Sequence, residues 1–197
     1  MNFSTKFDYQ TRFGKIGAWF DHLIFRPLFG AATAWSFDVL RLWLEKNIPP
    51  RVSLERTLIH WISVMLLALL WMYQGIVPKL LFPEAGELEV LKHTGFFPGW
   101  EHGVLIALGL IEIALGCLTI KHHTRKGVYT LQIVMLCFLT VGAVLGQPEL
   151  LQAPFNPLTL TLAMIGLCMT ACLSRIYLPS ARHCRRQPIG KKDSKEE

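Results

Sequence analysis

The sequence has no pair of cysteines at the CxxC spacing. Its five cysteines are Cys117, Cys137, Cys168, Cys172 and Cys184. Neither a thiol–disulfide relay nor a zinc ribbon is therefore indicated. Four of the five lie inside apolar runs, where free cysteine usually behaves as a small buried hydrophobe. We interpret them in that way and predict no metal site.

Charged residues are also few. They make up 17% of the chain, against 52% hydrophobic residues, and the mean hydropathy is +0.37. This composition excludes an ordinary soluble domain and indicates a membrane protein. The net charge of +6 would suit nucleic acid, but the positions of the charges account for it without a nucleic-acid partner.

Four apolar runs are long enough to approach the thickness of a bilayer, which a helix crosses in about 20 residues. They cover residues 57–77, 103–120, 128–145 and 158–177. Pro78 and Lys79 are expected to mark the water boundary of the first run. No signal peptide is expected before the runs, because residues 1–50 lack a compact apolar core behind a basic start. We predict an all-α membrane protein with a bundle of four transmembrane helices over residues 56–178.

Lysine and arginine are distributed unequally between the two sides of the predicted bundle. They are frequent before residue 57, between residues 121 and 126, and after residue 174. Residues 78–102 hold two lysines against four glutamates, and residues 146–157 hold no basic residue. Because cytoplasmic loops are enriched in basic residues, both termini are predicted to be cytoplasmic. The basic excess also favours contact with anionic lipid of the bilayer.

The segment of residues 1–55 is predicted to lie on the membrane surface. Read as a helix, residues 28–47 place Trp35, Val39 and Trp43 on one face and Asp38, Arg41 and Glu45 on the other. This arrangement is typical of an interfacial amphipathic helix. A docking surface or a partly inserted segment remains the alternative. Residues 87–95 are predicted to form a short helix ended by Gly95, and residues 179–197 a charged, disordered cytoplasmic tail.

Small and polar residues recur at helical spacing within the runs. One face of the second run holds Gly109, Glu112 and Gly116, and one face of the fourth holds Asn156, Ala163, Gly166, Thr170 and Ser174. Small residues let membrane helices approach, and polar residues bond across the contact. These faces are therefore predicted to form the polar seam of the bundle.

Glu112 lies near the middle of its run. An acid facing lipid at that depth costs about 2.5–3.5 kcal/mol on insertion scales, so Glu112 is expected to face the seam. Two interpretations stay open: a protonated carboxyl bonded to a neighbouring helix, or a ligand or proton site. Lys79 is not expected to be its direct partner, because it lies roughly 18 Å along the axis from the middle of its own helix. Trp71, Thr140 and Thr170 are nearer in expected depth.

Seven residues are candidates for ligand binding: Glu112, Gln74, Lys79, Trp71, His60, Gln132 and Asn156. His60 and Gln132 are expected near the cytoplasmic end and Gln74 and Lys79 near the outer end, so that with Glu112 they could line a polar path. For each residue alone, an interhelical hydrogen bond is the competing interpretation. A haem is not expected, because only His60 with His122 or His123 could supply two ligands on one side, and those loop histidines are expected to be exposed to water.

Three stretches resemble a known family. They are "WMYQGIVPKLLFPEAGELEVLKHTG", "GLIEIALG" and "PFNPLTLTLAMIGL", and they are similar to the DoxX-like bacterial membrane proteins. The matching positions are Gly75, Pro78 and Lys79 with a following acid at Glu84 or Glu87, Glu112 in the second run, and Asn156 with Pro157 at the start of the fourth. The resemblance covers residues 56–178 and implies a four-helix bundle in the bacterial inner membrane. Residues 1–55 have no counterpart in it.

The resemblance implies a role beside redox enzymes. Some DoxX-like relatives are subunits of thiosulfate:quinone oxidoreductase, and others belong to membrane redox complexes. The expectation is an accessory or anchor subunit, with quinone as the candidate cofactor and an oxidoreductase or a second copy as partner. A non-enzymatic carrier or scaffold for lipid or a small molecule is the alternative. The sequence shows no complete catalytic constellation, so it does not decide whether the chain is an enzyme.

Overall fold

The structure, a computed structural model, describes residue 12 and residues 14–84, 87–95, 97–152 and 156–180. These residues form helices and no strand. The helices are α1 (Gly14–Phe20), η1 (Asp21–Phe25), α2 (Arg26–Lys46), α3 (Pro50–Gln74), η2 (Gly75–Leu81), α4 (Glu87–Thr94), α5 (Glu101–Lys121), α6 (Lys126–Gly146), η3 (Pro148–Gln152) and α7 (Pro157–Ser174). Contacts divide the chain into two units, Met1–Ser53 with Pro179–Glu197, and Leu54–Leu178.

In the first unit, α1, η1 and α2 follow one another without a break. The helical segment thus starts before the predicted residue 28. It ends at Asn47, which adopts φ +54°, a left-handed conformation that asparagine tolerates at a helix end. The predicted tail of residues 179–197 lies outside the described residues except for Pro179 and Ser180.

The polar face of α2 was expected to be open to water, but part of it is covered. Asp38 is only 3% exposed. Its carboxylate accepts a hydrogen bond from the backbone N–H of Ser180 at 2.5 Å and pairs with Arg41 at 2.8 Å. Glu45 is exposed as predicted. The expectation was wrong for Asp38 because the periodicity of one helix does not show which other segment covers it.

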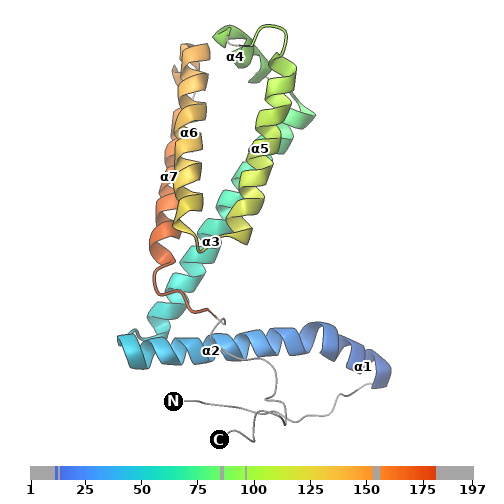
Figure 1. Ribbon diagram of the computed structural model, residues 1–197, viewed down its shortest axis with the longest axis vertical. Coiled ribbons are helices and arrows are strands. Elements are labelled where there is room, and N and C mark those ends of the chain that lie inside the picture. The colour runs from blue at the N-terminus through green and yellow to red at the C-terminus, as the bar shows by residue number, and fades with distance from the viewer. Residues whose placement is uncertain (1–11, 13, 85–86, 96, 153–155, 181–197) are drawn as a thin grey trace, which may run out of the picture. The chain divides into compact units, whose positions relative to one another are not determined.

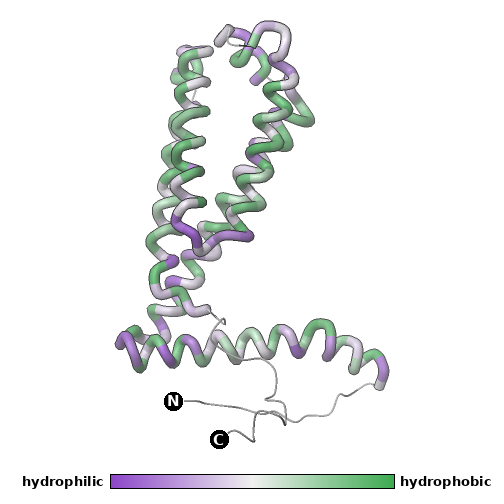
Figure 2. Tube along the Cα trace, viewed as in Figure 1, coloured by the Kyte–Doolittle hydropathy of each residue, from purple (hydrophilic) through white to green (hydrophobic). Residues whose placement is uncertain are grey.

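The second unit contains the four membrane spans that the sequence predicted. Long apolar helices cover Pro50–Leu81, Glu101–Lys121, Lys126–Gly146 and Pro157–Ser174. Figure 2 shows that hydrophobic residues predominate along these helices, with hydrophilic residues gathered at the α5–α6 turn. The first span does not end at Pro78, because η2 continues the helix past Lys79 to Leu81. Proline removes one backbone donor, and the wider π-helical turn accommodates it.

The spans pack as two helix pairs, with η2 against α5 and α6 against α7, whereas α5 and α6 touch only slightly. Figure 1 shows both pairs running side by side, with α4 at one end. We call this the α4 end and the opposite end the His60 end. A buried cluster joins the pairs: Val64, Leu67, Trp71, Leu115, Tyr129, Leu136, Met164, Cys168 and Ala171.

Glycines make the first helix pair close. A Cβ on Gly75 would lie 2.5 Å from the carbonyl oxygen of Gly109, and a Cβ on Gly109 would lie 2.9 Å from that of Gly75. A Cβ on Gly116 would lie 3.0 Å from the Ala68 carbonyl oxygen. The predicted Gly109–Glu112–Gly116 face is therefore confirmed as a helix contact.

The predicted face of α7 was wrong except for Ser174. Ala163, Gly166 and Thr170 are exposed, and the buried face of α7 consists of Thr161, Met164, Cys168, Ala171 and Ser174. The Thr170 hydroxyl donates to the Gly166 carbonyl at 2.9 Å, so it can face lipid without an unpaired donor. Spacing alone could not reveal this, because the lipid-facing side of a span is also apolar.

The interpretation of the cysteines holds only in part. Cys168 is buried and Cys172 is half-buried, whereas Cys117 and Cys137 are exposed on the spans. The short helix before α5 is confirmed as α4, and Gly95 follows it at φ +65°. A Cβ on Gly146 would lie 2.7 Å from the Val90 carbonyl oxygen, so α4 packs closely on the end of α6.

Candidate functional site

The most unusual feature of the second unit is an ammonium group buried between two carboxylates. Lys79 Nζ lies 3.0 Å from Glu112 Oε2 and 2.8 Å from Glu87 Oε2. The side chains of Lys79 and Glu112 are 7% and 2% exposed, and that of Glu87 is 40% exposed. We call these three residues the Lys79 triad. If all three groups are ionised, the triad carries one net negative charge.

The prediction that Lys79 would not reach Glu112 was wrong. It assumed that the middles of the first two spans lie at one depth. Instead, Gly75 packs at Gly109 and Ile113, so the middle of the first span lies nearer the His60 end than the middle of α5. Lys79 lies one helical turn beyond Gly75, and helical side chains point back toward the N-terminus of their helix. The long Lys79 side chain therefore returns to the level of Glu112.

A second cluster centres on Gln132. The Trp71 indole donates to Gln132 Oε1 at 2.9 Å, and Gln132 Nε2 donates to the Thr119 hydroxyl at 3.0 Å. The Cys168 thiol lies 3.7 Å from the same Gln132 oxygen. Gln132 is fully buried. These bonds join α3, α5, α6 and α7 and satisfy the polar groups that burial would otherwise penalise.

A third cluster surrounds His60. His60 Nδ1 lies 3.0 Å from the Ala171 carbonyl oxygen and 3.3 Å from the Ser174 hydroxyl, and His60 Nε2 lies 3.0 Å from His123 Nδ1. His123 was expected to be exposed to water, but it is half-buried against His60. The two imidazole nitrogens that a bis-histidine haem would need point at each other instead.

The other two candidates lie apart from these clusters. Asn156 caps α7, since its side chain accepts from the backbone N–H of Thr159 at 2.8 Å. Gln74 is half-buried and takes no part in the three clusters, as far as the described residues show. Lys79 and Trp71 are separated by roughly 12 Å of helix, and Trp71 and His60 by roughly 16 Å. Buried Leu67 and Val64 occupy the second interval, so the described side chains form separate clusters rather than one polar path.

Sequence reasoning missed three residues that matter here: Glu87, Thr119 and Cys168. Thr119 could have been found, because it continues the helical face of Glu112 and Gly116 at spacing 3. Glu87 was noted only as an acid after the lysine, since nothing in its local pattern shows that α4 folds back to Lys79. Within the described ranges, no three residues among histidine, cysteine, aspartate and glutamate are grouped as metal ligands.

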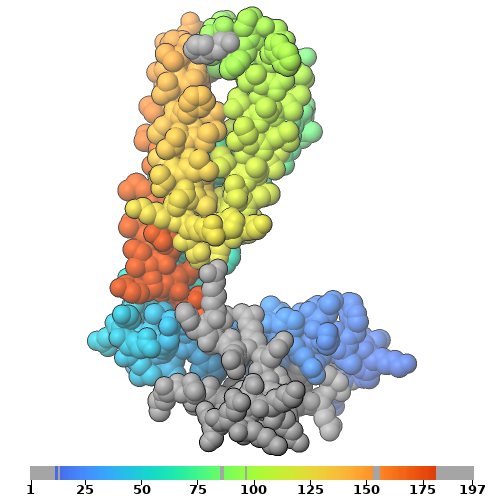
Figure 3. Space-filling view, viewed as in Figure 1, coloured from blue at the N-terminus to red at the C-terminus, as the bar shows by residue number. Residues whose placement is uncertain are grey.

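The space-filling view shows an opening between the two helix pairs. Figure 3 shows it between α5 and α6, on the side of α4. It agrees with the slight contact between these two helices. The helix pairs are thus in contact near the Gln132 and His60 clusters and separate toward the α4 end.

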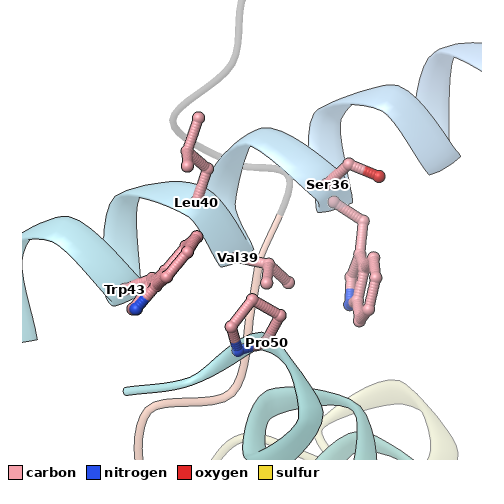
Figure 4. A pocket seen from close by; sticks show the side chains of 6 residues that line it. Ser36, Val39, Leu40, Trp43 and Pro50 are labelled. Atoms are coloured by element: carbon pink, nitrogen blue, oxygen red, sulfur yellow. The ribbon is translucent and has the colours of Figure 1, made fainter. Parts of the chain in front are cut away.

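The first unit has a shallow apolar pocket of its own. It is lined by Trp35, Ser36, Val39, Leu40, Trp43 and Pro50. Figure 4 shows Trp43, Val39 and Pro50 gathered along one side of α2. Trp43 is 48% exposed and Leu44 is 76% exposed. The apolar face predicted from Trp35, Val39 and Trp43 is therefore present on α2.

Four apolar spans with buried polar clusters define an all-α integral membrane protein. The sequence profile of the DoxX-like family matches residues 68–169, and the chain belongs to this family. It is 47% identical over 187 residues to the uncharacterized membrane protein YndG of Bacillus subtilis strain 168. This match covers 95% of the chain and 57% of the relative's length. No solved structure matches the chain.

Proposed function

We propose that the chain is an accessory subunit that anchors a redox complex in the bacterial inner membrane and binds quinone between its helix pairs. Its termini are cytoplasmic, and its α4 end faces outward. The chain itself performs no bond chemistry in this proposal. It supplies a membrane-embedded surface and a place for a membrane-soluble cofactor.

The observation that carries the proposal is the opening between α5 and α6 (Figure 3). Between 17% and 33% of the most apolar window of each span is buried inside the chain. The remaining surface is available to lipid tails, to an isoprenoid chain or to helices of another subunit. A pocket for a membrane cofactor is mostly apolar and carries a few placed polar groups.

The polar groups inside the unit support a binding role rather than a catalytic one. The Gln132 and His60 clusters bond chiefly to other groups of the same chain, which fixes the helices in place. The Lys79 triad differs from these two clusters because it contains an ammonium group and two carboxyl groups. An ammonium group donates up to three hydrogen bonds, and a quinone carbonyl is an acceptor that such a donor can hold.

The orientation rests on the distribution of basic residues. The turn at the His60 end contains Lys121, Arg125 and Lys126, whereas residues 146–157 at the α4 end contain none. Because basic residues favour the cytoplasmic side, this asymmetry supports a cytoplasmic His60 end.

Native mass spectrometry of the full chain extracted with its lipids tests the proposal. The wild-type chain is expected to retain quinone at a fixed ratio. Lys79→Met should lose quinone, because the chain then lacks its buried ammonium donor. Lys92→Met is the matched control: it removes an exposed lysine from α4 and should retain quinone.

Three results would count against the proposal. Quinone at no more than the level found in an unrelated membrane protein prepared in parallel would remove the quinone site. Phospholipid retained in its place would favour the non-enzymatic carrier. If Lys79→Met and Lys92→Met retain the same amount of quinone, Lys79 does not contribute to quinone binding.

A further inference from the structure

The Lys79 triad holds two carboxylates and one ammonium group in a largely buried space. Taken as whole residues, backbone included, Glu112 is 1% exposed and Lys79 is 6% exposed. At this depth an unbalanced charge is far more costly than at a surface. One ammonium balances one carboxylate, so the site lacks one positive charge.

The buried carboxyl group has an unfilled position. Glu112 Oε2 is within ion-pair distance of Lys79 Nζ, at 3.0 Å, but no hydrogen bond reaches this buried atom. Lys79 directs its donors at Glu87 instead, lying 3.2 Å from Oε1 and 2.8 Å from Oε2. The Glu112 carboxylate is the more deeply buried of the two and is therefore the harder one to keep charged. It is also the one that receives less hydrogen bonding from Lys79.

The titratable groups near Glu112 come from the elements that pack on α5. α3, which meets α5 at Gly116, carries Tyr73, which is exposed, and its other titratable residues, from Arg51 to His60, lie in its N-terminal half, away from this level. Lys79 faces Glu112 from η2 and Glu87 from α4. The other titratable residues of α4, Glu89, Lys92 and His93, are exposed. α6 has Lys126 at its far end, with Tyr129 in the first turn and Cys137 midway. No further cation among the described residues of these elements lies within ion-pair distance of the two carboxylates.

We propose that Glu112, Lys79 and Glu87 form a binding site for one exchangeable proton, which is held by Glu112 and reaches it from the α4 end past Glu87. Proton uptake converts the Glu112 carboxylate to a carboxylic acid and brings the site to net neutrality. Lys79 then pairs with Glu87 alone. The half-exposed Glu87 side chain connects the site to water. This proposal stands apart from quinone binding and needs no cofactor.

Infrared difference spectroscopy of the full chain in lipid nanodiscs tests the site. The pH is stepped from about 9 to about 5, a range that includes histidine titration and ends above the ordinary pKa of an exposed glutamate, about 4.3. The carbonyl band of a newly protonated buried carboxyl should appear in the wild-type chain, which should take up one proton more per chain than Glu112→Gln, because the seven histidines take up protons in both. Glu112→Gln should lose this band. Glu87→Gln should lose it too, because the remaining lysine and glutamate are already balanced.

The matched control is Glu89→Gln, which removes an exposed carboxylate from the same helix and should keep the band. Lys79→Met should show a protonated carboxyl at both pH values, since its counter-charge is gone. If that variant does not fold, Glu87→Gln still decides, because it changes a side chain at the edge of the unit. A band that persists in Glu112→Gln would overturn the proposal, and so would a band unchanged in Glu87→Gln or absent from the wild-type chain.

Discussion

Gly75 and Gly109 cross so closely that a Cβ on either would collide with the carbonyl oxygen of the other, at 2.5 Å and 2.9 Å. This crossing sets the register between the first two spans and places Lys79 at the depth of Glu112. An ion pair in the membrane thus depends on two residues that have no side chain.

Gly75→Ala and Gly109→Ala are each expected to lower the free energy of unfolding by about 1–3 kcal/mol, the usual range for overpacking. In an ordinary helix the same change would stabilise by nearly 1 kcal/mol. Gly142→Ala is the control, because its Cβ would meet nothing within 4 Å. Thermal unfolding in one detergent measures all three. Equal stability of the three variants would contradict the close crossing.

Gln132→Leu should destabilise the bundle by roughly 1–2 kcal/mol, because it leaves the Trp71 indole and the Thr119 hydroxyl without a shared partner. Trp71→Phe removes the indole donor while keeping an aromatic ring. If the two residues bond as described, the double variant should lose less than the sum of the single losses. Strict additivity in this cycle would show that the 2.9 Å contact contributes nothing.

Asn156→Ala should cost about 0.5–2 kcal/mol, the usual loss of an N-terminal helix cap. Asn156→Ser should restore most of it, because a serine hydroxyl can also accept from the Thr159 N–H. Chemical unfolding of both variants checks the prediction. Quinone or lipid retention measured in parallel separates capping from a ligand role: loss of ligand in a fully stable Asn156→Ser chain would assign Asn156 to the ligand site.

The topology predicts which positions a membrane-impermeant thiol reagent reaches from outside intact cells. The background is a chain whose five cysteines are replaced by serine or alanine. A cysteine placed at Glu89 should react without permeabilisation, and one placed at Thr124 should react only after it. The reverse pattern would invert the orientation and place α4 in the cytoplasm.

The apolar face of α2, formed by Trp35, Val39 and Trp43, predicts that the N-terminal unit binds the membrane surface. A peptide of residues 14–46 should bind vesicles containing anionic lipid. Replacing Trp35 and Trp43 by alanine should weaken binding by about tenfold or more, given the apolar area of an indole. Ser36→Ala, a change beside them on the same helix, is the control. No binding by the unaltered peptide would favour a docking surface or an inserted segment.

The sequence alone determined the class of protein and the positions of its spans. A bilayer requires apolar runs of fixed length, so the runs identify the helices without tertiary information. The same holds for Glu112: the cost of an acid in lipid requires it to face protein, and it is buried. The helix end at Gly95 is likewise local, since a helix end depends on its nearest residues.

Tertiary structure alone decided which residues meet. The depth of one span against another depends on where two glycines cross, and no pattern within either helix records it. The inward face of α7 was not recoverable for a related reason: in a membrane, both sides of a helix are apolar, so periodicity does not separate core from lipid. Glu87 reaches Lys79 only because α4 folds back onto the bundle. The chemistry of the Lys79 triad therefore results from packing, although each of its residues was visible in the sequence.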